Sequence, residues 1–352
     1  MIRFFNLVIL VLFASSAAFA SRAKMTSLQN NQHFPDLENA FLFPTKSFDL
    51  FPMVTFESGL TSAASAQTNA YVAGLWQQNS DVNWLYSVGR QNKTVQQSRE
   101  RYQAITSENL ELANSSVQII RSQKIAGIGY SLGASYSGRK DQIADEYENA
   151  ETIMAGLRFG HWSFSTEYAF KNQQQIPSFK YINIKNNLML AALYEVDNLT
   201  LSAQLNYLSG RQENSGLESQ SFDDQSYTFS FSDNSLFQTK LFFYKIDLLI
   251  NNLKYNLSTV RERSNQLPIS FGFENPISDF FKVRGSLKQT FLLNNNQDMA
   301  AADNNTNVAV GISYENSRVI VDSVLQGLTG NAANQKIDGN QLLSQVSVTY
   351  LF

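Results

Sequence analysis

The stretch "ETIMAGLRFGHWSFSTEYAF", residues 151–170, decides the fold class. Apolar side chains stand at nearly every second position before Gly160 and again after His161. A period of two places these side chains on one face of a β-strand, and the Gly-His pair predicts a tight turn. The apolar face carries Ile153, Ala155, Leu157, Phe159, Trp162, Phe164, Tyr168 and Phe170. The stretch therefore predicts a hairpin with one apolar and one polar face.

The same unit recurs along the chain, as in "NLMLAALYEVDNLTLSAQLNY", residues 187–207. We expect upstream strands at 53–60, 68–76, 82–90, 110–120 and 126–136, and later turns at Asn251-Asn252, 274–279 and 315–317. Longer polar loops are expected at 138–150, 172–186, 209–235, 294–306 and 327–340. The count is about sixteen strands, or about fourteen if the weakest pair is loop, and an even number is typical of bacterial barrels.

The stretch "QVSVTYLF", residues 345–352, shows what the two faces meet. Val346, Val348, Tyr350 and Phe352 share one face, and Gln345, Ser347 and Thr349 share the other. A barrel wall between lipid and a polar lumen needs this division. Aromatic residues gather near the expected short turns, where the girdle of a membrane barrel lies, which opposes the alternative of a soluble β-sandwich. They are Phe159, Trp162, Tyr194, Phe273, Phe281, Tyr314 and Tyr350.

The first twenty residues, "MIRFFNLVILVLFASSAAFA", predict a secretory signal peptide. Arg3 precedes an apolar run, and Ala18-Phe19-Ala20 forms a cleavage site before Ser21. A retained anchor helix is the alternative. No later run of about 18 apolar residues predicts a transmembrane helix. The chain has no cysteine, so a lipoprotein anchor is excluded. These features predict the bacterial outer membrane.

We therefore expect an all-β protein, a transmembrane antiparallel up-and-down β-barrel of about fourteen to sixteen strands with a short N-terminal hatch segment. The expected divisions are 1–20 as signal peptide, 21–50 as hatch segment and 51–352 as barrel. The formal net charge of −3 with mixed signs predicts no nucleic-acid partner. Outer-membrane lipid and a small-molecule solute are the expected partners.

The sequence contains few residues that suggest a catalytic site. The two histidines are His33, in the N-terminal segment, and His161, in a tight turn. His161 has no recognisable Ser or Asp partner in the sequence, which opposes a Ser-His-type site, and we expect no enzymatic activity. Catalysis by carboxylates alone is the alternative. No metal-ligand spacing, phosphate-binding loop or cysteine motif is present, which predicts no cofactor.

The polar face of the strands predicts the lining of the lumen. Lys282, Arg284 and Lys288 alternate with apolar residues, so three cations line one wall. Further charged candidates are Arg318, Asp322, Lys245, Asp247, Lys254, Glu167, Arg158 and Glu195. Such charges either tune the selectivity of an open path or pair with one another and hold a narrow interior shut.

Two resemblances add to this. A final strand with Tyr350 and Phe352 at its end resembles the signal read by the bacterial barrel assembly machinery, which implies that machinery as a partner. The stretch "FPDLENAFLFPTKSFDLFPMVTFESG", residues 34–59, is similar to the start of FadL-type hydrophobic-compound transporters. In that family this segment folds into the barrel as a hatch, and an Asn-Pro-Ala sequence is common there. Here Asn39-Ala40 lack the proline, and Phe34, Phe41 and Phe43 flank them.

The predicted function is passive passage of small solutes, hydrophobic ones included, through a hatch-gated outer-membrane barrel. One alternative is a closed structural or binding barrel whose extracellular loops contact a partner. Another is a general polar porin, and an outer-membrane enzyme is a third.

Overall fold

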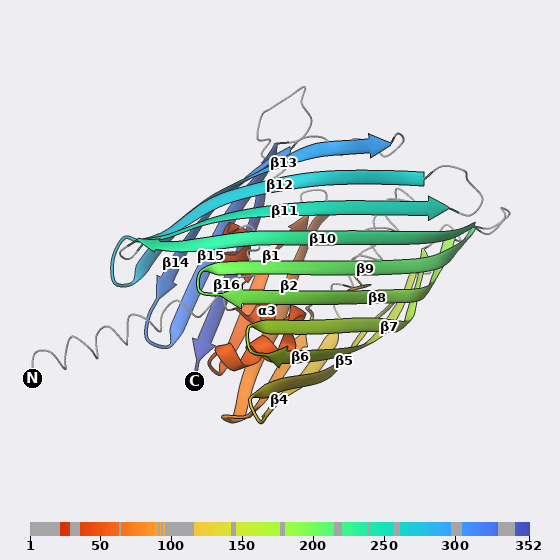
Figure 1. Cartoon of the computed structure of the whole chain (residues 1–352). Helices are drawn as coiled ribbons and strands as arrows, with labels where there is room; N and C mark the ends of the chain where they lie inside the picture. The colour runs from red at the N-terminus through yellow and green to blue at the C-terminus, as the bar shows by residue number, and fades with distance from the viewer. Residues whose placement is uncertain are drawn as a thin grey trace, which may run out of the picture.

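The computed structural model describes residues 22–28, 36–62, 65–90, 92, 94–95, 116–141, 146–176, 180–214, 220–237, 240–255, 261–296, 305–329 and 342–352. Sixteen antiparallel strands form a closed barrel in which each strand pairs with its neighbours in sequence, and β1 pairs with β16 (Figure 1). Closure leaves no strand edge unpaired, which a membrane-spanning sheet requires. The predicted fold class is confirmed.

The strands differ in length around the wall. Those from β5 to β13 have 14 to 18 residues, and the others are mostly shorter. The bounds are β1 Met53–Ser62, β2 Ser65–Asn79, β3 Val82–Val88, β4 Val117–Ile125, β5 Ile128–Asp141, β6 Glu146–Phe159, β7 Trp162–Ile176, β8 Lys180–Val196, β9 Leu199–Asn214, β10 Gln220–Phe237, β11 Lys240–Tyr255, β12 Arg261–Pro276, β13 Phe281–Asn296, β14 Asn305–Glu315, β15 Val319–Thr329 and β16 Leu342–Leu351. Because a strand rises about 3.3 Å per residue, the long strands reach beyond a hydrocarbon layer of about 30 Å.

One end of the barrel holds short turns. Two-residue turns join β4 to β5 at Ala126-Gly127 and β8 to β9 at 197–198. Ala126 and Gly127 have φ angles of 50° and 80°, as the two central residues of a type I′ hairpin turn require. Both barrel termini lie at this end, because β1 begins and β16 ends there.

The two faces of the wall differ as the alternation predicts. Val346, Val348 and Tyr350 are exposed on the outside, whereas Ser347 and Thr349 are buried on the inside. Thr349 Oγ1 lies 2.9 Å from Thr55 Oγ1 of β1, so the closing seam also joins polar groups across the lumen face. A continuous apolar exterior around a polar interior suits lipid and not water, and it defines an outer-membrane β-barrel of bacterial type.

Outward aromatic side chains cluster beside the short turns. The rings of Trp162 and Tyr194 have centroids 4.7 Å apart, and those of Phe281 and Tyr314 are 5.3 Å apart. Tyr350 and Phe352 meet edge to face at 5.3 Å. The first two contacts join neighbouring strands, and all three lie near one membrane interface.

Some predicted boundaries are wrong. The expected loop 209–235 is largely strand, since β9 continues to Asn214 and β10 occupies Gln220–Phe237. Residues 251–252 do not turn, because β11 runs through them, and the connection from β10 to β11 falls at 238–239. Strands also extend into the other expected loops, and β4 begins at Val117 and not near 110. Polar stretches that continue a strand past the bilayer lack an apolar face, so they resemble loops in the sequence.

The N-terminal segment packs inside the barrel. It contains α2 Arg22–Ser27, α3 Leu37–Leu42 and the 3₁₀ helix η2 Pro44–Asp49. Figure 1 shows α3 within the barrel, near the end that holds the short turns and the C-terminus. Asp36 caps α3 by accepting a hydrogen bond from the Asn39 N–H. In the part of the chain that the structure describes, no helix is long and apolar enough to cross a membrane.

An apolar cluster holds α3 against the inner wall. Leu37, Ala40 and Phe41 are buried together with Leu85 and Ile120, among others. Leu42 and Phe43 form a second cluster with Met189, Ala191 and Leu193 of β8. Burial of an aromatic or leucine side chain contributes about 1.5–3 kcal/mol, so these residues dock the segment independently of its charges.

Candidate functional site

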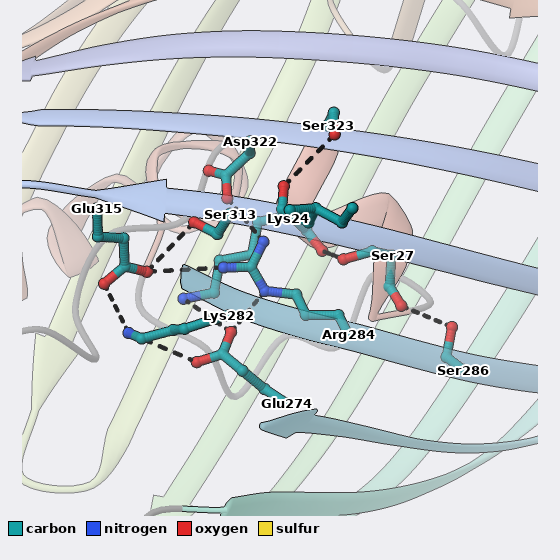
Figure 2. A network of polar contacts seen from close by, with 11 residues as sticks. Lys24, Ser27, Glu274, Lys282, Arg284, Ser286, Ser313, Glu315, Asp322 and Ser323 are labelled. Atoms are coloured by element: carbon teal, nitrogen blue, oxygen red, sulfur yellow. Dashed lines mark hydrogen bonds and ion pairs between the residues drawn. The ribbon is translucent and has the colours of Figure 1, made fainter. Parts of the chain in front are cut away.

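A network of charged side chains lines the lumen where β12 to β15 lie side by side (Figure 2). The Arg284 guanidinium, whose side chain is fully buried, donates from Nε to Glu274 Oε2 at 2.5 Å and from Nη1 to Asp322 Oδ1 at 2.6 Å. Lys282 Nζ lies 2.6 Å from Glu315 Oε2. We call these five residues the wall cluster. A buried guanidinium requires such partners, because an unpaired charge in the interior is costly.

The helix α2 adds a sixth charge to the wall cluster. Lys24 Nζ lies 3.7 Å from Glu274 Oε2, and its side chain is buried. The carbonyl of Ser27 accepts a hydrogen bond of 2.6 Å from Ser286 Oγ of β13 (Figure 2). With Lys24 in place, three cations face three carboxylates. The N-terminal segment therefore completes the charge balance of the wall.

A second anchor involves α3 and the connection between β3 and β4. Arg90 donates from Nε and Nη2 to the two oxygens of Glu38, at 3.0 and 2.9 Å. Tyr71 donates to Glu38 Oε1 at 2.7 Å, and Gln118 accepts from Arg90 at 3.1 Å. The guanidinium also lies 4.2 Å from the centre of the Phe41 ring, a cation–π contact.

The 3₁₀ helix η2 is held by the opposite part of the wall. Lys46 Nζ lies 2.6 Å from Glu195 Oε1, and Arg158 Nη1 lies 2.7 Å from Asp49 Oδ2. Glu195 and Arg158 thus occupy the lumen-facing positions that the sequence predicts, and both pair with the N-terminal segment. Sequence patterns alone give no sign of these partners.

The beginning of the β3–β4 connection folds into the barrel, which the sequence did not predict. Asn92, Thr94 and Val95 are buried. Thr94 donates from its hydroxyl to Glu167 of β7, and its carbonyl accepts from Asn187 Nδ2 of β8 at 2.8 Å. Glu167 therefore lines the lumen and receives an inward-folded loop. In the sequence, such a loop is indicated by a long polar stretch between two strands. The stretch does not indicate whether the loop folds into the barrel or away from it.

A separate pair occupies β11. Lys245 Nζ lies 3.0 Å from Asp247 Oδ2, and both face inward, as predicted. Lys288 also faces inward and is half-buried.

Two predicted lumen residues lie elsewhere. Arg318 is exposed in the turn between β14 and β15, so it does not line the lumen. Lys254 is exposed on β11 at a position an odd number of residues from Lys245, and alternation places it on the outer face. His161 is exposed in the β6–β7 turn, and His33 lies outside the described residues.

The predicted hatch residues cluster in one place. Asn39, Ala40, Phe41 and Phe43 are buried in or beside α3, whereas Phe34 lies outside the described residues. Tyr350 and Phe352 lie on the outer side at the closing strand, and the Phe352 N–H donates to the Pro52 carbonyl at 3.2 Å.

A hollow of about 520 Å³ lies on the outer surface of β6 to β10. Its lining includes small residues such as Ala155, Ala192 and Ala203 and larger ones such as Phe164 and Phe229. It faces the bilayer, so it is not part of the site described above.

No protein-family model and no curated protein matches the chain. Solved outer-membrane barrels resemble it in shape. A loop L8 deletion mutant of OmpT, an outer membrane protein of Vibrio cholerae, is 11% identical with a TM-score of 0.44, and the match covers 86% of this chain and 98% of that one. An anion-selective porin from Comamonas acidovorans is 10% identical with a TM-score of 0.40, and the match covers 86% of this chain and 98% of that one. A bacterial polysaccharide outer membrane secretin is 8% identical with a TM-score of 0.49, and the match covers 86% of this chain and 97% of that one.

The prediction that the protein is not an enzyme is withdrawn. OmpT barrels stand among the structural neighbours, so the fold supplies no basis for excluding an activity. An identity of 9–11% is informative about fold alone, and it assigns no chemistry to this chain.

Proposed function

We propose that the protein is a passive channel of the outer membrane whose lumen is narrowed by the N-terminal segment, described over residues 22–28 and 36–50, acting as a hatch. The observation that carries this proposal is the manner of anchoring. Ion pairs to Glu274, Arg90, Glu195 and Arg158 hold the segment inside the barrel. A sixteen-stranded barrel is wide enough to leave an aqueous path beside such a segment.

The inner wall of β9 and β10 supports an open path. In the middle of these two strands, inward side chains such as Ser202, Ser226 and Thr228 are half-buried, whereas those of β2 to β4 beside the segment are buried. Partial exposure on the inside means that neither the segment nor the described loop fills this part of the lumen. Small solutes would pass along this wall.

The resemblance to FadL-type transporters is part of this proposal. An apolar, proline-containing segment folded against the inner wall is the arrangement that the resemblance implies. The exposed side chains of the inner wall are polar, however, which favours polar solutes over hydrophobic ones.

Two other functions make different predictions. A closed structural or binding barrel, favoured by the balanced wall cluster, would show no permeability. A general polar porin would conduct without influence from the N-terminal segment. We also propose Tyr350 and Phe352 as contacts of the assembly machinery. Phe352→Asp should then lower the amount of heat-resistant barrel in the outer membrane, and normal amounts would oppose this assignment.

A disulfide tether tests the hatch. A Cβ atom added at Gly129 would lie 3.6 Å from the Cβ of Thr45, within the range of a disulfide. The chain has no cysteine, so a bridge between Thr45→Cys and Gly129→Cys would be unique. Other atoms lie 3.4 Å or more from the added Cβ, so the substitution fits.

The measurement is single-channel conductance in planar bilayers, before and after reduction, with each single variant as control. We expect rare openings in the oxidised protein and restored openings after reduction. Removal of residues 24–46 should raise conductance severalfold in a barrel that still shows a heat-dependent gel shift. Equal conductance in the tethered double variant, the two single variants and the deletion variant would favour the porin alternative. A lack of conductance in all of these proteins would favour the closed barrel.

A further inference from the structure

A ladder of uncharged polar side chains lines the inner face of β9 and β10. The ladder consists of four successive cross-strand pairs, and each residue of a pair carries a hydroxyl or an amide group. The pairs are Thr200 with Ser232, Ser202 with Ser230, Gln204 with Thr228, and Asn206 with Ser226. At about 3.3 Å per residue the ladder extends for roughly 20 Å along the strands, and its half-buried part begins at Ser202 and Ser230, because Thr200 and Ser232 are buried.

The ladder lies between the two places where the N-terminal segment meets the wall. On one side, Met189, Ala191 and Leu193 of β8 pack against Leu42 and Phe43. On the other side, Phe243 of β11 packs against Met25 and Leu28. The segment therefore touches the strands flanking the ladder, while Ser202, Gln204, Ser226, Thr228 and Ser230 themselves remain half-buried.

The hydrogen-bonding capacity of the ladder is only partly used. Gln204 Nε2 donates to Asn206 Oδ1, and Asn206 Nδ2 donates to Ser226 Oγ, both at 2.9 Å. Among the described residues, the hydroxyls of Ser202, Thr228 and Ser230 have no hydrogen-bond partner. A hydroxyl both donates and accepts, so three adjacent ones present several open positions to whatever occupies the lumen.

The two charges directly across from the ladder on β11 are paired with each other. Ser230 and Ser232 are cross-strand neighbours of Asp247 and Lys245, which pair with each other at 3.0 Å. The eight ladder residues themselves carry no charge that could pair with an ion. A hydrophobic solute would leave the hydroxyls without partners, which is unfavourable.

We propose that this ladder is the solute-contact surface of the channel and that it favours neutral, hydroxyl-rich solutes of the polyol and oligosaccharide class. A polyol exchanges its hydrogen bonds with water for equivalent bonds with successive rungs, so it moves along the wall without losing them. The inference rests on the proposed channel function and adds its substrate class.

The test uses three probes that share one six-carbon skeleton: sorbitol, gluconate and N-methylglucamine. Swelling of liposomes that contain the full-length protein reports how fast each probe enters. We expect sorbitol to enter about threefold faster than either charged probe, because the charged probes lose solvation without gaining a partner.

A ladder variant carries Ser202→Ala, Thr228→Val and Ser230→Ala. Its control carries Ser163→Ala, Ser165→Ala and Thr166→Val on β7, which changes the same residue types. Ser163 and Ser165 are inward and buried, and Thr166 faces outward. We expect the ladder variant to lose about threefold in sorbitol entry, and the control to lose none, with the KCl conductance of both preserved.

Each other outcome has a defined meaning. Equal entry of the three probes, or unchanged sorbitol entry in a conducting ladder variant, overturns the ladder inference and leaves the channel standing. Faster entry of gluconate or N-methylglucamine overturns it too. A wild-type protein that passes neither ions nor any probe removes the channel, and the ladder inference falls with it.

Discussion

Glu38 on α3 and Arg90 at the start of the β3–β4 connection form a two-point ion pair, with N–O distances of 3.0 and 2.9 Å. The pair joins two obstructions of different origin: the N-terminal segment and the inward-folded connection whose Thr94 reaches Glu167 on the far wall. Because the carboxylate and the guanidinium match in shape, the contact fixes orientation as well as distance. Movement of the segment would therefore disturb the loop.

Arg90→Gln tests this connection. The Arg90 side chain is 5% exposed, and loss of its charge leaves Glu38 without its bidentate partner. We expect the folded barrel to lose about 3 kcal/mol of stability and its openings to become more frequent. Denaturation monitored by the gel shift, together with single-channel recording, measures both. The double variant Glu38→Gln/Arg90→Gln should recover part of the loss, whereas strictly additive losses would contradict the pairing.

Asp36 gives the hatch a pH dependence. Burial raises the pKa of the Asp36 carboxyl well above its usual range, an effect that Glu38 reinforces, while the Asn39 N–H and the charges of Lys46 and Lys24 lower it in part. A group with a raised folded-state pKa stabilises the fold below its ordinary pKa, and this contribution is lost as pH rises through the raised value.

Docking of α3 should therefore weaken, and openings should increase, as pH rises through the raised pKa of Asp36. Asp36→Asn keeps a side-chain oxygen for the helix cap and cannot ionise. Its conductance should stay nearly constant over the same pH range. Identical pH profiles for the wild type and the variant would show that this carboxyl does not control the segment.

Gly311 allows close approach of α2 to the wall. A Cβ atom at this position would lie 2.9 Å from the Cβ of Ser27 and 3.1 Å from its Oγ. Gly311→Ala should therefore displace α2 and raise conductance by about twofold, since packed interiors tolerate little added volume. Gly129→Ala, where added atoms meet ordinary contacts of 3.4–3.6 Å, is the matched control. Equal conductance in the two variants would oppose a role for α2 in narrowing the lumen.

The sequence predicts the wall best where the wall meets lipid. The hairpin of β6 and β7 was found because outward residues such as Ile153 and Trp162 are apolar and inward ones are mostly not. β10 was missed although Tyr227, Phe229 and Phe231 alternate in it, because serine and aspartate surround them. A strand that continues beyond the bilayer meets water on both faces, so its pattern fades while its hydrogen bonds persist.

The site was predictable only in part, for a related reason. Parity along a strand correctly orients Arg284, Asp322 and Glu195, since side-chain direction is a local property. Lys24, which pairs with Glu274, and Lys46, which pairs with Glu195, belong to a segment more than a hundred residues away. No local pattern encodes where that segment docks. Lys254 was misplaced by neglecting the same parity that orients Lys245.

Lys24 determines the net charge of the lumen beside α2. With it, the wall cluster is balanced; without it, Glu274, Glu315 and Asp322 face only Lys282 and Arg284. An excess carboxylate in a confined lumen attracts cations and repels anions.

Lys24→Met should therefore shift the channel toward cation selectivity, whether α2 stays docked or leaves the wall, because either state leaves the extra negative charge behind. The reversal potential across a tenfold KCl gradient should move toward the potassium equilibrium potential, by about 10 mV or more given the focusing of charge in a narrow pore. Lys254→Met removes the same charge from the outer face, where it is exposed, and should leave the reversal potential unchanged. A shift toward chloride in Lys24→Met, or equal shifts in both variants, would show that the wall cluster does not face the conducting path.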